Sequence, residues 1–506
     1  MKKGIILVNA LVFAAIAVTV TIALVNWGAQ TLKTVRTLTQ REQAFQIAEA
    51  GIDYYRWHLA HFPADYTDGT TTPQPYVHAF EDELGNTIGH FDLTVTAPPI
   101  GSTLVTVKSK GVLAADPTIY RTIQATLGKP SFARYAFAAD DFMRFGSGTT
   151  VNGPIHSNKG IHFDGLALST VSSALATTTD PDNNCGSPAN CALEWAVFTQ
   201  VGTDDPQPLP VNNPSPTFQQ LGHQDVFPIG RSISVPNISF SSITNDLSVL
   251  KQAAHDAEPA TDRYNLPDAG SGYYGYHMVF ADSAGTTTYR LYKVTALVNS
   301  PSNSCTSSQN QASSQTNWGT WSIASESAYP SAAGNTFHLP STGVIFAADN
   351  VWVDGTVGDG ARVTIAVGVL PAPPPPPAPD IIINSDLKYT LKDGSEVIGL
   401  IAQGNVTVGL NSGNTMEIDG ALVAQGGRVG RFYYNGNCGV NNDRTTLNLY
   451  GMIATAVRYG FAYGDPPTSG YQTRNITYDP NLLYGPPPSF PLSSSQYVPL
   501  SWKEIQ

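Results

Sequence analysis

The acidic side chains of this sequence are the first candidates for catalytic chemistry. Asp140-Asp141 and Asp204-Asp205 are adjacent pairs, and neighbouring side chains in a strand point to opposite faces. The two carboxylates of a glycosidase must instead lie about 5 to 10 Å apart around one bond. Three more aspartates each precede a glycine, which is typical of a turn: Asp354, Asp359 and Asp419. The carboxylates therefore do not predict an active site.

The histidines are no stronger as catalytic candidates. His156 and His162 share strand parity, so they would point to the same side of an extended chain. Turn residues flank both, and we expect exposed, structural imidazoles rather than a metal site or a catalytic pair. The motifs G-x-S-x-G, H-E-x-x-H and the P-loop do not occur. The chain is predicted not to be an enzyme and to need no cofactor.

One acidic segment resembles the start of a calcium-binding loop. In DPDNN, Asp180, Asp182 and Asn184 occupy the first, third and fifth positions of such a loop. The residue after them is Cys185 instead of glycine, and the twelfth position holds Cys191 instead of glutamate. A looser calcium site is therefore a weak candidate, and a plain turn rich in Asp and Asn is the alternative.

The four cysteines predict disulfides. Cys185 and Cys191 bracket a turn in NNCGSPANC and can close a small loop, while Cys305 and Cys438 lie among residues typical of surface loops. The sequence has no C-x-x-C pair and no histidine at zinc-ligand spacing from a cysteine. Two disulfides are expected, with their connectivity left open.

The N-terminal residues predict a membrane-spanning helix. Residues 5–25 form an apolar run without a charge, long enough at about 1.5 Å per residue to cross a hydrocarbon layer of about 30 Å. Lys2 and Lys3 precede this run, and little positive charge follows before Lys33. The positive-inside rule therefore predicts a single pass, with the N-terminus cytoplasmic and the bulk of the chain outside the membrane.

The same helix is predicted to continue to about residue 60. A cleaved secretory signal would have a shorter apolar core and an A-x-A-like site. Here apolar and amphipathic residues recur at steps of three and four well beyond the membrane length, giving a helix of about 80 Å. They are Leu32, Val35, Leu38, Glu42, Phe45, Ala48, Ile52, Tyr55 and Leu59.

The first 60 residues resemble the N-terminal region of PilX-type minor pilins of the type IV pilus system. The likeness is carried by a short basic leader that ends at Gly4, by the apolar helix that follows at once, and by AFQIAEAGI at residues 44–52. It implies cleavage after Gly4 by a prepilin peptidase, with Ile5 as the new N-terminus. It also implies that the helix assembles with other pilins in a fibre.

Six residues of this segment are expected to contribute to assembly. The small residues Ala48 and Gly51 would let neighbouring helices approach closely, as Ala44 and Ala50 also would. Glu49 would pair with a basic group of a neighbour. Phe45 belongs to the apolar face of the same stretch.

Asn9 departs from the pattern of major pilins. Those proteins carry a glutamate at the fifth mature position, where it meets the free N-terminal amine of the next subunit. Counted from Ile5, that position is Asn9, which cannot neutralise an ammonium group. The protein is similar in this respect to subunits that initiate or cap a fibre, such as the K-type tip subunit of type II secretion pseudopili. The alternative is an anchor that never leaves the membrane.

Beyond the helix, the apolar period changes from 3.6 to 2. Residues 88–97, 104–113 and 119–127 alternate, and turn-forming segments separate them. Within residues 61–130 we therefore expect an antiparallel sheet similar to a pilin headgroup.

From residue 131 onward, a different pattern predicts a β-solenoid. Similar short segments begin with glycine, run through aliphatic residues and turn on small or amide residues. They span residues 153–163, 343–353, 399–408, 420–429 and 451–457. An ordinary β-sandwich is the alternative. The predicted headpiece covers residues 131–506, with a loop insertion at about 171–340 that is helical near 241–257, and a proline-rich loop at 371–379.

The predicted fold class is α+β, mainly β, and the predicted function is that of a PilX-like minor pilin or pseudopilin at the cell surface. A net charge of −12 disfavours binding to the phosphate backbone of nucleic acid, so nucleic acid is not an expected partner. The expected partners are other pilins or pilus assembly proteins, the membrane, and a surface or glycan ligand for the loops of the headpiece. The alternatives are a static surface anchor and a solenoid carbohydrate-active enzyme.

Overall fold

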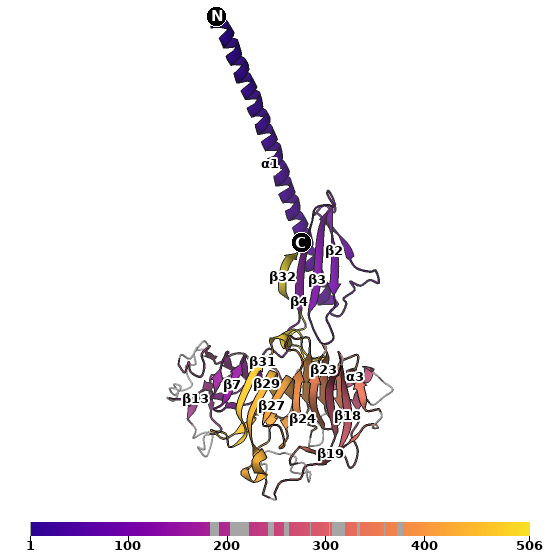
Figure 1. Ribbon diagram of the computed structural model, residues 1–506, viewed down its shortest axis with the longest axis vertical. Coiled ribbons are helices and arrows are strands. Elements are labelled where there is room, and N and C mark those ends of the chain that lie inside the picture. Colours follow the sequence, from indigo (N-terminus) through magenta and orange to yellow (C-terminus); the bar gives the residue numbers. More distant parts are fainter. Residues whose placement is uncertain are drawn as a thin grey trace. The chain divides into compact units, whose positions relative to one another are not determined.

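The computed structural model describes the chain except for residues 1, 183–191, 203–221, 241–246, 258–262, 284, 303, 306–318, 331–333, 359, 372–377 and 506. The chain forms two compact units (Figure 1). Unit 1 comprises Met1–Pro98, Leu104–Lys129 and Ser495–Gln506, and unit 2 comprises Pro99–Thr103 and Pro130–Ser494. Much of the proline-rich loop predicted at 371–379 lies outside the described residues.

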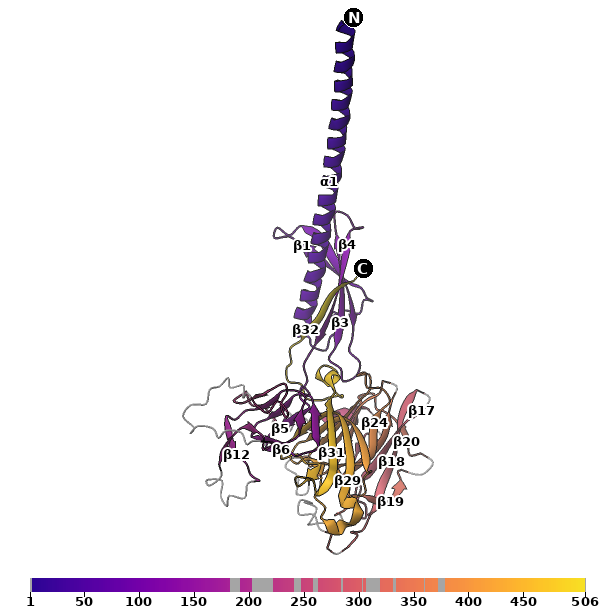
Figure 2. The ribbon, with the colours of Figure 1, turned by 60° about the vertical axis from the view of Figure 1, so that its left-hand side comes forward.

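Helix α1 (Lys2–His61) is a single helix of 60 residues, about 90 Å long. It continues through the membrane-length segment because no proline precedes Pro63, and its threonines bond to carbonyls four residues earlier, as Thr31 does to Trp27. The uninterrupted helix predicted from the periodicity is therefore present. Within unit 1, α1 extends beyond the sheet over most of its length, and the part from Ala44 onward lies against it (Figure 2).

The sheet of unit 1 has five antiparallel strands in the order β1-β2-β3-β4-β32. Their bounds are β1 (Tyr76–Glu81), β2 (Thr87–Thr96), β3 (Val105–Leu113), β4 (Tyr120–Gly128) and β32 (Val498–Ile505). Strands β2, β3 and β4 lie within one residue of the three ranges predicted from alternation, whereas the two edge strands were not predicted. Buried residues such as Leu93 and Val107 pack against α1.

The last residues of the chain correct one predicted boundary. Residues 495–506 were assigned to the headpiece, but they belong to unit 1, where β32 pairs with β4. An edge strand needs the backbone of one neighbouring strand and only a weak apolar pattern of its own, so its sequence gave little signal.

Unit 2 is built largely of parallel strands that pair with strands distant in sequence. The longest ladder contains, in spatial order, β16 (Asn265–Leu266), β21 (Val344–Ala347), β23 (Arg362–Val367), β25 (Val397–Ala402), β27 (Thr415–Ala424), β29 (Asp443–Thr455), β5 (Phe137–Ala139), β8 (Ile155–Ser157), β11 (Val171–Ser173) and β15 (Arg231–Ser232). Strands from early in the chain thus follow the late strand β29.

Further parallel ladders lie beside the first. One contains β17 (Tyr276–Ser283), β22 (Val351–Val357), β24 (Ile381–Tyr389), β26 (Val406–Val408) and β28 (Val429–Arg431). Another continues from β27 and β29 to β31 (Ser469–Tyr478), β7 (Thr149–Asn152) and β10 (Leu166–Ala167). A short one contains β6 (Met143–Phe145), β9 (Ile161–Phe163) and β14 (Val197–Phe198).

The remaining elements of unit 2 are antiparallel pairs and short helices. The pairs add β12 (Thr177–Thr179) with β13 (Leu193–Trp195), β18 (Thr286–Leu297) with β17, β19 (Ile323–Ala328) and β20 (Thr336–His338), and β30 (Ala462–Tyr463) with β31. Among the described residues, the helices are α3 (Leu247–Ala257) and the 3-10 helices η3 (Gly436–Asn442) and η4 (Pro480–Leu483).

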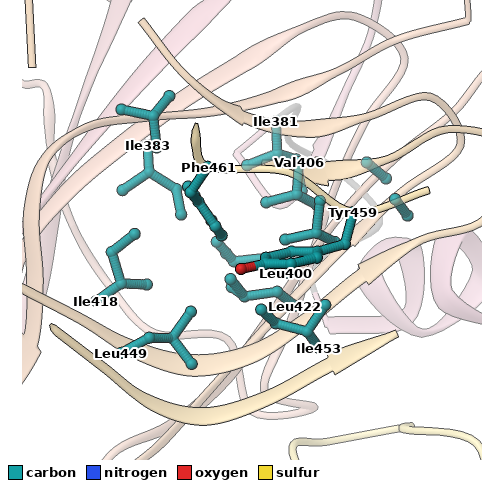
Figure 3. Packing of buried hydrophobic residues seen from close by; sticks show 14 of the residues in the cluster. Ile381, Ile383, Leu400, Val406, Ile418, Leu422, Leu449, Ile453, Tyr459 and Phe461 are labelled. Carbon is teal, nitrogen blue, oxygen red and sulfur yellow. The ribbon is translucent and has the colours of Figure 1, made fainter. Parts of the chain in front are cut away.

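Stacked aliphatic side chains explain the register of the main ladder. Strands β21, β23 and β25 are buried on both faces, and a slip of one residue would exchange the side chains of the two faces. Residues paired from strand to strand form one buried column: Ile345, Ile365, Leu400, Leu422, Ile453, Phe137, Ile155 and Val171. Figure 3 shows Leu400, Leu422 and Ile453 packed with Tyr459. The five glycine-led segments singled out in the sequence all contribute strands to these ladders.

The predicted loop insertion at 171–340 is only partly loop. Strands β11 and β15 extend one end of the main ladder and β16 the other, while β17 pairs in parallel with β22. The prediction of a loop insertion is therefore wrong for these strands. Strands β11, β15 and β16 were missed because they are two or three residues long, too short for a periodic signal, whereas β17 was missed despite its eight residues.

Candidate functional site

The exposed surface of α1 is the strongest candidate for a functional site. Among the residues that the structure describes, α1 is the one helix long and apolar enough to cross a membrane. Apolar side chains along residues 5–25 are exposed, including Ile5 at 63% and Phe13 at 72%. This surface cannot face water stably, because each large apolar side chain left exposed forfeits about 1.5–3 kcal/mol of burial. It therefore requires lipid or another apolar helix.

The apolar surface continues past the length needed for a membrane. Trp27, Leu32, Val35 and Leu38 are 71%, 62%, 53% and 61% exposed. They precede the part of α1 that the sheet covers, which begins at Ala44. About 20 residues of helix suffice to span the hydrocarbon layer, so these four side chains extend the surface by three further turns.

From Ala44 onward, α1 packs on its own sheet through the small residues expected to contact other helices. Ala44 and Ala48 are fully buried. A Cβ atom placed on Gly111 of β3 would lie 2.1 Å from the Ala44 carbonyl oxygen and 2.4 Å from the Ala48 backbone nitrogen. Helix and strand thus touch through backbone atoms. The expectation that Ala48 serves helix–helix approach is therefore wrong: it serves contact between α1 and β3.

Gly51 has the same role one turn further along. A Cβ atom placed there would lie 2.2 Å from Ser109 Oγ and 2.9 Å from the ring of Phe91. Phe45 is half-buried, and its ring meets Trp502 of β32 edge-on at 5.6 Å between centroids. Gly51 is therefore not free for assembly, and Phe45 is only partly so. The sequence could show that these residues permit close packing but not which surface they pack against.

Glu49 lies on the opposite, solvent-facing side of α1. It is exposed in a polar stripe with Glu42, Gln46, Asp53 and Arg56. Their spacing of three or four residues places them on one helix face. Glu49 is therefore accessible to a basic group of another subunit, and its predicted pairing stays a prediction.

The N-terminal processing residues lie within the helix. Gly4 and Ile5 belong to α1, and Asn9 is exposed on its surface. An exposed amide in a lipid-length apolar segment is costly to bury unless it is hydrogen-bonded. Cleavage after Gly4 stays a prediction.

The two histidines considered as catalytic candidates are buried, not exposed. His156 is 1% exposed, with Nδ1 3.0 Å from Ser172 Oγ, and burial lowers the pKa of its imidazole. His162 is fully buried between the carboxylates of Asp164 at 2.8 Å and Asp180 at 2.9 Å. Burial alone would lower the pKa of His162, but the two carboxylates raise it overall. Both imidazoles are held in the interior by polar partners.

The candidate calcium residues have other partners. Asp180 is 1% exposed and accepts from His162 and from the backbone N–H of Asp182. Asp182 pairs with Arg144 at 3.2 Å and with Arg458 at 2.6 Å. Asn184 lies outside the described residues. Within the described part of the chain, no group of three or more His, Cys, Asp or Glu side chains could hold a metal ion.

Two of the four cysteines are joined, which supplies part of the connectivity that the sequence left open. Cys305 and Cys438 form a disulfide that links segments 133 residues apart. Cys438 is buried in η3, beside a cluster that includes Trp321 and Trp352. Cys185 and Cys191 lie outside the described residues, so their predicted loop stays a prediction.

Comparisons with known proteins add little to these observations. No protein-family model matches the chain, and no curated protein matches it significantly. Among solved structures, the chain is similar to the competence-associated pilin ComZ from Thermus thermophilus. The two are 14% identical, with 92% of this chain and 98% of that chain covered, at a TM-score of 0.29. A likeness of that size carries no argument about fold or function.

Proposed function

We propose that this chain is a PilX-like minor pilin or pseudopilin, which inserts in a membrane through α1 and assembles through the same helix into a type IV pilus-type fibre. The observation that carries the proposal is the division of α1 into a covered and an uncovered part. From Ala44 onward the helix is fixed to the protein's own sheet, while the residues before Ala44 are uncovered and include the apolar segment 5–25. A rigid helix of this kind can exchange lipid for equivalent surfaces on neighbouring subunits.

The stretch between membrane and sheet favours assembly over a static anchor. A tether needs apolar side chains only across the hydrocarbon layer. Trp27, Leu32, Val35 and Leu38 lie beyond that length and are exposed. Packing against other helices would bury them, and each would then contribute about 1.5–3 kcal/mol.

Asn9 supports a place at the end of the fibre. Its amide cannot neutralise the N-terminal ammonium of a following subunit, so this chain should accept a neighbour on one side only. Unit 2 would then be displayed outside the cell for adhesion or assembly. The parallel ladders of unit 2, with their stacked aliphatic column, support a β-solenoid architecture for this headpiece. We propose no catalytic role for it.

N-terminal sequencing of the chain isolated from its own cells, together with its co-purification with pilins, tests the proposal. We expect the mature chain to begin at Ile5 and to co-purify with pilin subunits after shearing of surface fibres. A chain that retains Met1–Gly4 and stays in the membrane fraction without pilins would be a static anchor, contrary to the proposal.

A further inference from the structure

The lining of one cavity in unit 2 carries more positive than negative charge. The cavity has a volume of about 470 Å³, within the range of small-ligand sites. Four arginines and two aspartates line it, an excess of two positive charges in a chain whose net charge is −12. The charged lining residues are Arg144, Arg428, Arg458, Arg474, Asp182 and Asp465.

Arg474 supplies a buried charge to this cavity. It projects from β31, is 2% exposed, and donates to Thr149 Oγ1 at 2.8 Å and to backbone carbonyls of Tyr471 and Gln472 at 2.6 and 2.9 Å. These acceptors are neutral, and burial lowers the pKa of the guanidinium, although the nearby charge of Asp465 acts in the opposite direction. A buried cation held by neutral groups remains costly, and an anion in the cavity would offset that cost.

The other arginines hold the cavity wall in place. Arg458 forms a two-point pair with Asp182, at 2.6 and 2.7 Å, and Arg144 lies 3.2 Å from the same carboxylate and 3.7 Å from Asp465. Arg144 is also 3.5 Å from Asp164, behind the lining. A guanidinium has five N–H donors, and the pair with Asp182 uses two of those of Arg458. The arginines are therefore oriented before any ligand arrives.

Uncharged surfaces of the cavity indicate more than a simple anion. Tyr459, Phe461 and Tyr463 contribute to its lining, and the Tyr463 hydroxyl accepts from Arg428 at 2.9 Å. The carboxylates of Asp182 and Asp465 are acceptors, which suit hydroxyl donors of a ligand. Tyr459 and Phe461 belong to the core behind the lining, while Tyr463 is partly exposed. Cations, carboxylate acceptors and the edge of one tyrosine together match a sugar ring that carries one acidic group and several hydroxyls.

We propose that this cavity binds an acidic saccharide unit, with Arg428 and Arg458 contacting its anionic group and Asp182 or Asp465 accepting from its hydroxyls. Carboxylated and sulfated sugars share the chemistry that the cavity would recognise. The inference deepens the proposed display function, on which it rests only for the exposure of unit 2 outside the cell. Binding itself needs no fibre, so a failure of either proposal can be told from a failure of the other.

Calorimetric titration of the purified full-length chain tests this inference, in a polyoxyethylene detergent that carries no sugar. The probes are cellotetraose and the same tetrasaccharide with every C6 oxidised to a carboxylate, which differ only in that group. We expect the carboxylated form to bind at least tenfold more tightly, with an affinity that falls as salt is added. Equal affinities, or binding of neither, would refute the proposal.

Substitutions locate the binding and exclude a simple anion site. Arg428→Gln and, separately, Arg458→Gln should each weaken binding of the carboxylated tetrasaccharide at least tenfold. Arg134→Gln removes an exposed guanidinium that stacks on Tyr135 outside the cavity and should leave affinity unchanged. Unchanged binding by both cavity variants would place the ligand elsewhere. Inorganic sulfate that binds as tightly as the tetrasaccharide would refute the saccharide assignment. Matching thermal unfolding of the three variants would exclude misfolding.

Discussion

His277 makes the stability of unit 2 depend on pH. It is 6% exposed on β17, with Nδ1 2.6 Å from Glu326 and Nε2 3.2 Å from Asp354. Burial alone would lower the pKa of His277, but the two carboxylates raise it to about 9. Because the unfolded value is about 6.5, the ion cluster stabilises the fold fully below pH 6.5. That contribution is lost as the pH rises through 9.

We therefore expect the free energy of unfolding of unit 2 to fall by roughly 3 kcal/mol between pH 6 and 10 through His277 alone. Urea denaturation at several pH values measures it, as the difference in pH slope between the parent chain and His277→Gln. His255→Gln, which alters an exposed histidine of α3, is the matched control and should keep the parent slope. The same slope in His277→Gln would contradict the charge assignment.

Asn9 is the residue whose replacement should move the subunit within a fibre. Asn9→Glu would place a carboxylate where it can neutralise the N-terminal ammonium group of a neighbouring subunit. This ion pair would offset the cost of about 2.5–3.5 kcal/mol for an acidic side chain in lipid. We expect several-fold more copies per fibre, counted by immunogold labelling along sheared fibres. Asn9→Gln keeps the amide and should behave as the parent does. Unchanged labelling in both variants would show that Asn9 does not determine where the subunit lies in a fibre.

At the level of single residues, the sequence predicted what kind of packing a residue permits better than it predicted which groups surround that residue. The sequence indicated that Ala48 and Gly51 permit a close approach to another element, and in the structure both residues are closely packed. Whether the helix face that carries them meets β3 or another helix depends on Gly111 and Ser109, some sixty residues away. For His156 and His162, burial depends on the strands β11 and β14, which pair with β8 and β9 from 16 and 36 residues further along the chain. Local pattern does not contain such information.

The contact between α1 and β3 determines how firmly the helix is attached to unit 1. Gly111→Ala would place a methyl group against backbone atoms of Ala44 and Ala48, which cannot rotate away. We expect the free energy of unfolding of unit 1 to fall by about 2–3 kcal/mol or more. Hydrogen exchange of β3 amides measures the loss, since these amides are protected by the sheet.

Gly28→Ala is the matched control for this change. Gly28 lies in the exposed part of α1, and a Cβ atom there would have no neighbour within 4 Å. Alanine favours a helix by about 1 kcal/mol over glycine, so this variant should be slightly more stable than the parent. Equal protection of β3 in the two variants would contradict the packing of α1 on β3.

The elements of unit 1 that the sequence revealed are those with long periodic signals, whereas in unit 2 the repeated glycine-led segments revealed even short strands such as β8. Helix α1 and strands β2, β3 and β4 carry nine residues or more each, enough to show a period of 3.6 or 2. Strands β11, β15 and β16 have two or three residues, and β32 lies at a sheet edge, so neither kind has a periodic signal of its own. Their positions follow from the strands they pair with.

At the level of the whole molecule, unit 2 is inserted between two neighbouring strands of unit 1. β4 leads into unit 2 and β32 returns from it, and the two strands pair with Gly128 opposite Val498. The order of strands in unit 2 could not be predicted either, because β5 stacks on β29 across some three hundred residues. A discontinuous unit of this kind leaves no signature in local sequence.

This arrangement predicts that unit 1 folds without its insertion. The backbone N–H of Ser493 donates to the carbonyl of Pro130 at 3.0 Å, which is the bond that closes a two-residue turn. Replacing residues 131–492 by Asn-Gly should therefore join β4 to β32 as a hairpin. We expect the shortened chain to retain α1 and the five-stranded sheet, measured by circular dichroism and cooperative thermal unfolding. It should still co-purify with pilins.

The same chain truncated after Tyr497 lacks β32 and should unfold at a lower temperature. Loss of cooperative unfolding in the shortened chain with β32 present would mean that unit 1 needs its insertion to fold.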